Sequence, residues 1–288
     1  SSTGDSLYST KKFHLVQPSE LAAFATELSQ VERFAFDTET SGAYPIGSEI
    51  IEFGAVKWKN GTEIATIQTL LKPKELLSEF NMSIHGISNE MVATAPKMPE
   101  KIREIYDFLS HAVLIAHHAP FDLGFLAVAI EENKLVLPAG PILCSSLLSR
   151  KIIHGCENHK LQTLVRYLNL DGGTAHRALD DARSCLKVGL ECFKRLGDAV
   201  TLSELLKCQD KSLRWSDYSL LNGKNAIINA LIDAIQKKKN VDLLYEKTAT
   251  KAESRSVSPL GIVRNPDGDY LQAICLRDKI AKRYYLSK

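Results

Sequence analysis

Four acidic side chains in three separate segments follow short apolar runs or begin helices, and this pattern constrains the fold more than any other feature of the sequence. Asp37 and Glu39 close the apolar run 34–36 and, being two residues apart on a strand, point to the same face of a sheet. Asp122 comes after a second apolar run, and Asp181 falls in the first turns of a later helix. Acids in apolar surroundings are costly to bring together unless a positive charge compensates them.

Each of these acids also has an ordinary explanation when it is considered alone. Asp37 can end a strand, Asp122 can cap the helix after His117–Pro120, and Asp180 with Asp181 can be first-turn carboxylates favoured by the helix dipole. The ordered set is better explained by divalent cations, because oxygen ligands suit Mg²⁺ or Mn²⁺. Two such ions about 3.5 to 4 Å apart stabilise both the attacking and the leaving oxygen of a phosphoryl transfer. The acids therefore predict two divalent metal ions, Mg²⁺ or Mn²⁺.

The periodicity of the first two thirds of the chain predicts a mixed α/β domain, with strands dominating early and helices late. Two strands separated by Asn60-Gly61 form a hairpin, because this dipeptide favours the tight turn between antiparallel strands. Apolar residues at three- and four-residue spacing predict amphipathic helices further on. The predicted strands are 34–37, 50–59, 64–71 and 113–116, and the predicted helices are 99–109, 121–132, 161–168 and 178–196.

A second, smaller domain is predicted after Gly197, where the pattern weakens. One helix face at 224–238 precedes short β-like runs broken by turn residues, at 241–245, 257–263, 270–276 and 283–286. We therefore expect a flexible N-terminus at 1–12, an α/β domain at 13–197, a linker at 198–222 and a small, mainly-β domain at 223–288.

The charge of the chain is unevenly distributed between these parts. Residues 1–200 contain 20 Lys and Arg against 24 Asp and Glu, whereas residues 201–288 contain 16 against 10, so the net charges are −4 and +6. A basic C-terminal part is an indication of a polyanionic partner, although a solvated charged surface gives the same count.

Several classes of protein are excluded or disfavoured by the apolar pattern and the cysteines. The longest apolar run, Leu123–Ile130, is far shorter than the roughly 20 residues that a bilayer requires, so we expect no membrane association. The first residues lack the apolar block of a secretion signal, and the six cysteines form no Cys-x-x-Cys pair, so we expect a cytoplasmic location with reduced thiols. His154, Cys156 and His159 lack a fourth zinc ligand nearby and are better explained as incidental loop side chains.

The acidic segments carry three motifs in a fixed order, with a fourth short motif between the first two. They read FDTETSG at 36–42, IHGI at 84–87, AHHAPFD at 116–122 and HRALDDA at 176–182. With these motifs, residues from about 30 to 196 resemble the DEDDh exonucleases of the DnaQ-like superfamily. The resemblance implies an RNase H-like fold, in which helices flank a mixed central sheet. It also implies that Asp37, Glu39, Asp122 and Asp181 are metal ligands, and His176, five residues before Asp181, places the chain in the histidine subclass.

One position departs from the family pattern. The family usually has Ala-His-Asn-Ala where this chain has Ala-His-His-Ala at 116–119, so the imidazole of His118 replaces an amide. The four acids are unaffected, but the hydrogen bonding available around Asp122 changes, and such changes tune metal affinity.

The hydrolysis of a phosphodiester requires charge neutralisation and a base, because negative charge shields the phosphorus from water. The side chain of histidine titrates near pH 6.5, so we assign His176 the role of general base for the attacking water. By resemblance, Thr38, Thr40, His85 and Phe121 are candidate contacts of the terminal nucleotide, and packing or turn formation explains each of them equally well.

The C-terminal part resembles a WYL domain, a small module of bacterial regulators and nucleic-acid enzymes. The resemblance is carried by VDLLY at 241–245, SRSVSPL at 254–260, YLQAICLR at 270–277 and RYYL at 283–286, and Asp269 stands where the name-giving Trp is missing. The resemblance implies a groove for nucleic acid or a small nucleotide-like ligand, formed by Tyr245, Arg255, Tyr270, Arg277 and Arg283. The alternative is a β-module that packs against the catalytic domain.

The sequence and the resemblance together predict a metal-dependent exonuclease that converts single-stranded nucleic acid to nucleoside 5'-monophosphates, and the 3'-5' polarity is what the resemblance implies. We favour DNA over RNA as substrate, with the strand or its 3' end as the partner. The alternatives are a proofreading subunit that binds a DNA polymerase and a regulator that binds nucleic acid without cutting it. The presence of all four acids and His176 argues against the regulator. The sequence does not determine the oligomeric state.

Overall fold

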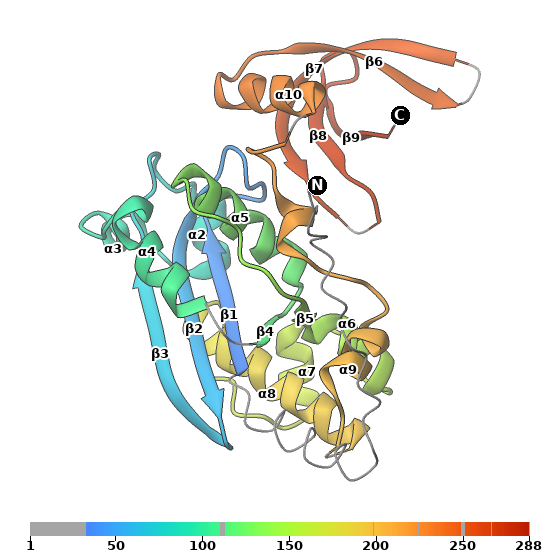
Figure 1. Cartoon of the computed structure of the whole chain (residues 1–288). Helices are drawn as coiled ribbons and strands as arrows, with labels where there is room; N and C mark the ends of the chain where they lie inside the picture. The colour runs from blue at the N-terminus through green and yellow to red at the C-terminus, as the bar shows by residue number, and fades with distance from the viewer. Residues whose placement is uncertain are drawn as a thin grey trace, which may run out of the picture.

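The protein consists of a larger α/β unit and a smaller C-terminal unit, which lies at the top of Figure 1. The computed structural model describes residues 33–109, 113–197, 199–223, 225–248, 251–265 and 267–287. The expected N-terminal segment 1–12, and the first part of the expected α/β domain, lie outside the described residues. In the described ranges, no helix is long and apolar enough to cross a membrane.

The larger unit is built on a mixed five-stranded sheet with the strand order β3-β2-β1-β4-β5. Strand β1 pairs antiparallel with β2 on one side and parallel with β4 on the other, so the acid-bearing strand is central. Asn60 and Gly61, both with positive φ, form the predicted hairpin turn between β2 and β3. The strands are β1 (Arg33–Thr40), β2 (Ile50–Lys59), β3 (Thr62–Leu70), β4 (Val113–Ala116) and β5 (Ile142–Cys144).

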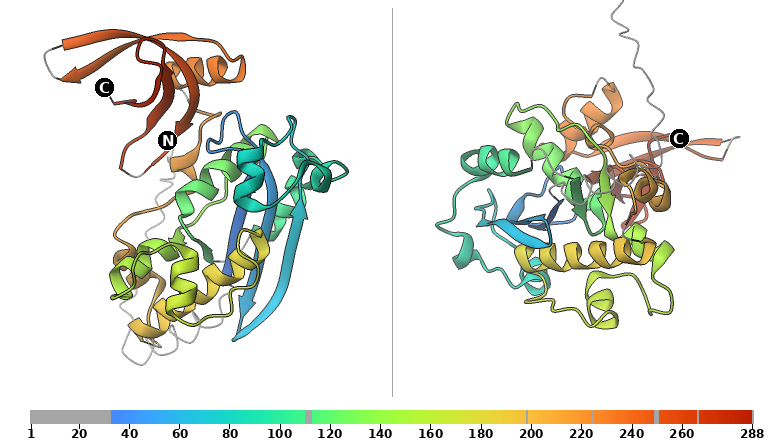
Figure 2. Two further views of the ribbon diagram at one scale, coloured as in Figure 1. Left: turned by 180° about the vertical axis from the view of Figure 1, so that it is seen from behind. Right: turned by 60° about the horizontal axis from the view of Figure 1, so that its bottom comes forward.

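Helices cover both faces of this sheet. Phe34 and Phe36 of β1 face a core formed with α4 and α5, whereas Ala35 faces a core formed with α6, α7 and α8. Figure 2 shows α8, in yellow, running along one face of the sheet. The helices are α2 (Glu79–His85), α3 (Asn89–Val92), α4 (Met98–Leu109), α5 (Ala119–Glu132), α6 (Ser145–Ile152), α7 (Leu161–Tyr167) and α8 (Ala178–Leu196). The predicted fold, a mixed sheet flanked by helices, is confirmed.

Of the segment 198–222, expected as a linker, the described residues 199–222 are folded onto the larger unit. It contains α9 (Leu202–Gln209) and the 3₁₀ helix η1 (Trp215–Tyr218). Trp215 and Tyr218 are fully buried in the core shared with α5, and Leu205 is buried in the core on the other face of the sheet. The weak helical periodicity of this segment is explained by large apolar side chains that are inserted singly rather than along one helix face.

The C-terminal unit is a four-stranded antiparallel sheet with the order β6-β7-β8-β9, packed on one helix. The small mainly-β domain predicted from the sequence is therefore confirmed. Its elements are α10 (Ala226–Gln236), β6 (Val241–Thr248), β7 (Lys251–Val263), β8 (Tyr270–Cys275) and β9 (Ile280–Tyr285). Asn225 caps α10 by accepting hydrogen bonds from the backbone N–H groups of Ile227 and Ile228.

A glycine on β2 determines how closely α8 approaches the sheet. A Cβ atom at Gly54 would lie 2.1 Å from the backbone nitrogen of Leu179 and 2.2 Å from the carbonyl carbon of Ala178. Gly54 is also the cross-strand partner of Asp37. The first turn of α8 therefore reaches the acid-bearing strand only because position 54 has no side chain.

We predict that Gly54→Ala lowers the free energy of unfolding by about 1 to 3 kcal/mol or more, because the new methyl group meets rigid backbone. The matched control is Gly189→Ala within α8, where a Cβ would lie 3.6 Å from Ile115, at ordinary contact distance. This control should leave stability unchanged or raise it by up to about 1 kcal/mol through helix propensity. Urea unfolding of the two variants decides the point, and equal stabilities would contradict the packing argument.

Candidate active site

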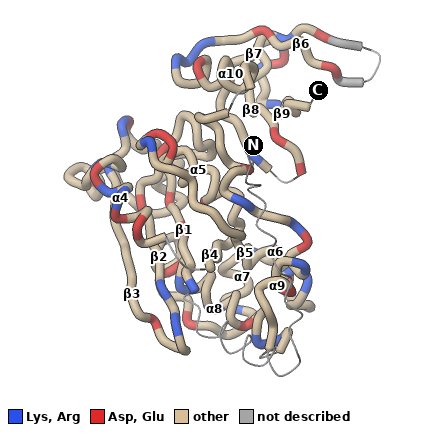
Figure 3. The backbone as a smooth tube through the Cα atoms, in the orientation of Figure 1, with Lys and Arg blue, Asp and Glu red and all other residues tan. Residues whose placement is uncertain are grey.

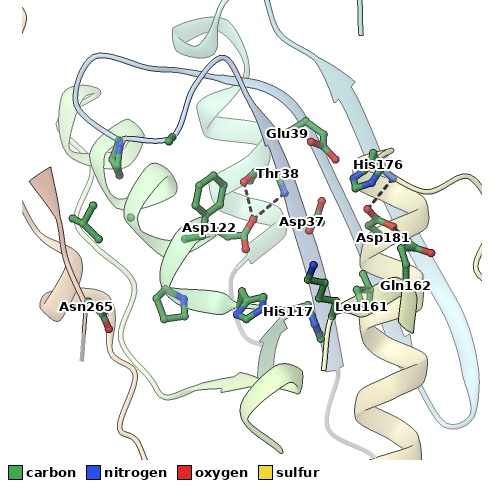
Figure 4. A pocket seen from close by; sticks show the side chains of 18 of the residues that line it. Asp37, Thr38, Glu39, His117, Asp122, Leu161, Gln162, His176, Asp181 and Asn265 are labelled. Atoms are coloured by element: carbon green, nitrogen blue, oxygen red, sulfur yellow. Dashed lines mark hydrogen bonds between the residues drawn. The ribbon is translucent and has the colours of Figure 1, made fainter. Parts of the chain in front are cut away.

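The acid-bearing end of β1 opens into a large pocket with a volume of about 1100 Å³ (Figure 4). Its walls come from β1, the start of α5, the segment before and within α7, the start of α8, and the C-terminal unit. Asp37, Glu39, Asp122, His176 and Asp181 all line it. The structure thus brings together the four predicted metal ligands and the predicted base.

The alternation of side chains along β1 distributes its residues between the two faces of the sheet. Asp37 and Glu39 lie on the face covered by α8, and Thr38 lies on the opposite face with Phe36, toward α5. Thr38 donates to the Oδ1 atom of Asp122 from its backbone nitrogen at 3.0 Å and from its hydroxyl at 2.7 Å. Thr38, a predicted substrate contact, therefore fixes the orientation of a predicted metal ligand.

The start of α8 brings in the remaining groups. Asp181 is 6% exposed, and it accepts hydrogen bonds from the side-chain amide of Gln162 at 2.8 Å and from the backbone nitrogen of His176 at 3.0 Å. His176 itself is exposed to the pocket and has a left-handed backbone, with φ of 60°. Ligand atoms of Glu39, His176 and Asp181 all lie within 4.8 Å of one another. Within the described ranges, this is the one group of three metal-ligating side chains that lies so close together.

A buried glutamate that the sequence reasoning did not identify holds the start of α8 in place. Glu52 of β2 is fully buried and accepts hydrogen bonds from Arg177 at 2.8 and 3.2 Å, from the backbone nitrogen of Ala178 at 3.0 Å and from Gln68 at 2.8 Å. Burial by itself would raise the pKa of Glu52, but these hydrogen bonds lower it below its usual value. Glu52 is therefore an ionised acid that anchors the helix.

The four predicted ligands have the opposite electrostatic environment. Burial, followed by repulsion from Asp181 and Glu52, raises the pKa of Glu39 to about 8. Burial raises the pKa of Asp122 to about 7 against the opposing effect of the Thr38 hydrogen bonds. Burial and the neighbouring carboxylates raise the pKa of Asp37 well above its usual range, and burial raises that of Asp181.

This environment fits divalent cations. Carboxylate oxygens from three elements converge on one pocket, and their raised pKa values express a deficit of positive charge that bound cations would remove. Asp37, Glu39, Asp122 and Asp181 are the residues that would hold the ions, and oxygen donors of this kind suit hard cations.

The two histidines before α5 have different roles. The Nε2 atom of His117 lies 3.0 Å from the carbonyl oxygen of His159 and must donate to it, so Nδ1 accepts from the Ser145 hydroxyl at 2.8 Å. Burial lowers the pKa of His117 to about 3, so this side chain is a neutral structural link. His118 precedes α5 with φ of 57° and makes no side-chain capping bond. Asn and His are among the residues that tolerate this left-handed backbone, which explains how His118 replaces the usual Asn.

The other predicted substrate contacts lie in different places. Phe121 lines the pocket and is 41% exposed. Thr40 donates to the carbonyl oxygen of Gly42 in the β1–β2 loop and does not line this pocket. His85 is buried at the end of α2, and its Nδ1 atom accepts from the backbone nitrogen of Ile87 at 3.0 Å.

The segment from Glu157 to Arg166 forms a wall of the pocket that the sequence reasoning missed. It contributes two cations, Lys160 and Arg166, and the amides of Asn158 and Gln162. The helical periodicity of this segment identified only its buried side, Leu164 and Val165. The concentration of polar and basic residues on the opposite side was the available signal.

The five candidate groove residues of the C-terminal unit are divided between the two faces of its sheet. Tyr245 and Arg255 lie on the face that packs on α10, where Arg255 pairs with Glu253 at 2.6 Å and with Asp278 at 3.3 Å. Arg277 also pairs with Glu253, at 3.2 Å. Tyr270 and Arg283 lie on the other face, where the guanidinium of Arg283 is 5.0 Å from the centre of the Tyr270 ring.

The positive charge of the C-terminal unit is also distributed among acids rather than gathered in one stripe, as Figure 3 shows.

The loop residues considered for zinc make local contacts. The Sγ atom of Cys156 lies 3.6 Å from Nε2 of His159, and the carbonyl oxygen of His154 accepts a hydrogen bond from the hydroxyl of Tyr167.

Sequence profiles of known families match both units. The profile of the RNase T exonuclease family matches residues 34–188, more than half of the chain. The chain belongs to this exonuclease family. Its motifs and architecture are of the DEDDh type, whose members use divalent metal ions. The profile of the WYL domain matches residues 226–288.

Curated relatives support the assignment of the larger unit. A PolC-type DNA polymerase III from Caldanaerobacter subterraneus subsp. tengcongensis is 33% identical over 165 residues, which cover 57% of this chain and 12% of the polymerase. A DNA polymerase III subunit epsilon-like protein from Rhodobacter capsulatus is 36% identical over 170 residues, which cover 56% of this chain and 24% of that protein. The chain thus matches a quarter or less of the length of these relatives.

Solved structures share the fold of the larger unit. The nuclease domain of 3'hExo, a DEDDh family member bound to rAMP, is similar with a TM-score of 0.51 and 20% identity, over 60% of this chain and 96% of that domain. The cell-death related nuclease 4 is similar with a TM-score of 0.50 and 15% identity, over 59% of this chain and 65% of the nuclease.

The raised pKa of Glu39 predicts that the metal-free protein loses stability as the pH rises. An unfolded glutamate titrates near pH 4.3, whereas folded Glu39 retains its proton up to about pH 8. The folded state therefore binds more protons in this window, so its extra stability is complete below the lower pKa and is lost as pH rises through the higher one. In EDTA, we expect this loss to appear as a fall in the melting temperature of the wild-type protein relative to that of Glu39→Gln as the pH rises toward about 8.

The matched variant is Glu39→Gln, which should flatten this dependence because it removes the titrating group. Mg²⁺ or Mn²⁺ should also flatten it for the wild-type protein, by compensating the carboxylates. A wild-type melting temperature in EDTA that follows that of Glu39→Gln across this window would contradict the electrostatic description of the site.

Proposed function

We propose that this protein is a metal-dependent 3'-5' exonuclease that hydrolyses single-stranded nucleic acid, with DNA favoured over RNA, to nucleoside 5'-monophosphates. The observation that supports it most strongly is the convergence of Asp37, Glu39, Asp122 and Asp181 with His176 on one pocket. Two Mg²⁺ or Mn²⁺ ions held by the four acids would supply charge neutralisation at the phosphate and a more acidic water.

The chain's own residues perform the positioning and the proton transfer in this proposal. Thr38 and Gln162 hold the carboxylates of Asp122 and Asp181 in fixed orientations. His176 is exposed to the pocket at the end of the loop that precedes α8, and it accepts the proton of the attacking water. The hydrogen bond from its backbone to Asp181 fixes the position of this base relative to the acids.

The substrate-binding part of the pocket has both apolar and cationic walls. Pro120 and Phe121 offer apolar surface for a base, and Lys160 and Arg166 offer positive charge for phosphates. Exposed aromatic surface beside cations suits unpaired nucleotides, which supports a single-stranded substrate. The preference for DNA is supported by the relatives, whose names are those of DNA polymerase components.

A second candidate, a proofreading subunit, has the same chemistry and adds a polymerase as partner. It is favoured by the relatives named as PolC-type polymerase and as an epsilon-like subunit. Co-purification of a DNA polymerase with the full chain is the test of this partner.

We predict that Asp37→Ala and Asp181→Ala each reduce turnover by about 10³-fold or more, because each removes a carboxylate that would hold the metal ions. Both variants should remain folded, since removing one acid from a crowded anionic site relieves repulsion. The assay follows an end-labelled single strand of DNA and one of RNA with Mg²⁺ or Mn²⁺, and with excess EDTA. Undiminished cleavage by either variant, or in EDTA, would remove the two-metal proposal.

We predict that His176→Asn reduces the rate of the chemical step by about 10² to 10⁴, the usual contribution of a positioned base. Asparagine is chosen because it tolerates the left-handed backbone at this position, so the hydrogen bond to Asp181 is retained. Because the His176 ring also lies near ligand atoms of Glu39 and Asp181, the affinity for Mn²⁺ is measured in parallel. Unchanged metal affinity with a slow chemical step supports a base, whereas a large loss of metal affinity would make His176 a ligand instead.

A further inference from the structure

The pocket of the catalytic unit has one wall that comes from the other domain. The residues Val263, Arg264 and Asn265, at the turn between β7 and β8, line the same pocket as the four acids. Figure 4 shows Asn265 across the pocket from Glu39 and His176. Pockets for a single drug-sized ligand usually measure about 300 to 1,000 Å³. The volume of about 1100 Å³ therefore leaves room beyond one terminal nucleotide.

This wall is held against the catalytic unit by a shared apolar core. Ile46 of the β1–β2 loop and Val128 of α5 are buried together with Leu231 and Ile235 of α10. On the face of the C-terminal sheet opposite α10, Gly261 packs against Tyr44 so closely that a Cβ at Gly261 would lie 2.2 Å from the Tyr44 side chain.

Polar contacts hold the connection between the two units as well. The buried carboxylate of Glu131 accepts hydrogen bonds from the hydroxyl of Ser219 and from the backbone nitrogens of Leu220, at 3.1 Å, and Leu221, at 2.9 Å. Lys211 pairs with Asp267 of the β7–β8 turn at 2.6 Å. These contacts, together with the shared apolar core, hold residues 263–265 at the pocket.

The chemistry of the turn suits a nucleic-acid backbone. Asp269 orders it by accepting from the Nη1 atom of Arg264 at 2.8 Å and from the backbone nitrogen of Asn265 at 3.1 Å. The Nε atom of Arg264 is buried, so a phosphate can meet only the terminal nitrogens of this side chain, which is 21% exposed and lines the pocket. A guanidinium has five N–H donors in a planar fork, and the ion pair with Asp269 engages Nη1 alone, so donors remain for a phosphate while the ion pair fixes the position of Arg264.

We propose that residues 263–265 of the C-terminal domain form the far wall of the substrate cleft, and that Arg264 contacts a backbone phosphate upstream of the terminal nucleotide. This inference rests on the proposed exonuclease function and extends it. The C-terminal domain then sets how many nucleotides the enzyme holds, and it acts on substrate within the catalytic pocket.

The test distinguishes contacts to the terminal nucleotide from contacts to the strand upstream of it. The substrates are the p-nitrophenyl ester of thymidine 5'-monophosphate, which has no upstream phosphate, and a long oligothymidylate. We expect Arg264→Gln in the full chain to raise the Kd for the long oligothymidylate, measured with Ca²⁺ by fluorescence anisotropy, by about tenfold, and to slow cleavage of the long strand much more than hydrolysis of the ester.

The salt dependence of binding distinguishes a phosphate contact from a structural effect. Loss of one phosphate contact on a single strand should reduce the slope of log Kd against log salt concentration by about 0.7. Arg264→Lys should restore most of the slope, because it retains the charge. The matched control, Lys237→Gln, removes a cation of the same domain that pairs with Asp233 outside the pocket, and it should leave affinity and slope unchanged.

Photo-crosslinking of the wild-type protein avoids any dependence on the folding of the variants. A long oligothymidylate with 4-thiothymidine upstream of its 3' end should crosslink to the tryptic peptides that span residues 256–277. The inference is overturned by the absence of this crosslink, or by equal Kd values and salt slopes for wild type and Arg264→Gln while the wild type cleaves both substrates. If the wild type cleaves neither substrate with Mg²⁺ or Mn²⁺, the proposed function itself fails.

Discussion

The contact between the first turn of α8 and strand β2 is the constraint on which the active site depends. Asp181 can face Asp37 only because Gly54 lets the helix backbone approach the sheet, and Glu52 then holds the helix end through Arg177. The carboxylate of Glu52 accepts from a backbone N–H at the helix N-terminus, where the helix dipole also favours negative charge. Close packing at Gly54 and the charge of Glu52 therefore both position the first turn of α8.

Two neighbouring glutamates illustrate how environment separates structural from functional acids. Glu39 and Glu52 are direct cross-strand partners on β1 and β2, so they share one face of the sheet. Glu52 is surrounded by donors and has a lowered pKa, whereas burial and nearby acids raise that of Glu39 to about 8. The protein thus compensates the acid that anchors α8 with its own groups. It leaves the pocket acids uncompensated, which is the condition under which cations bind.

The sequence predicted the strands and helices that have a regular apolar pattern, and the acids at their ends, because strand alternation and helix periodicity are local properties. It placed Asp37 and Glu39 on one face correctly, and the three motifs contain the other two acids that line the pocket, Asp122 and Asp181. Glu52 could not be distinguished from any other acid on a strand, because its role depends on Arg177, which is distant in sequence. The pattern of the segment 198–222 predicts a linker, because the burial of a single side chain such as Trp215 leaves no periodic signal.

The position of the second domain follows from the same strand that carries the acids. The chain leaves Glu39 and enters the β1–β2 loop, where Asn81 donates to the carbonyl oxygen of Ser41, and this loop then presents Tyr44 and Ile46 to the C-terminal unit. The loop therefore belongs to both the acid-bearing strand and the domain interface. Removing the C-terminal unit would expose Ile46 at this interface and would take away one wall of the pocket. The WYL domain is thus joined to the acid-bearing strand by shared packing, so one loop positions both the acids and the opposite wall of the pocket.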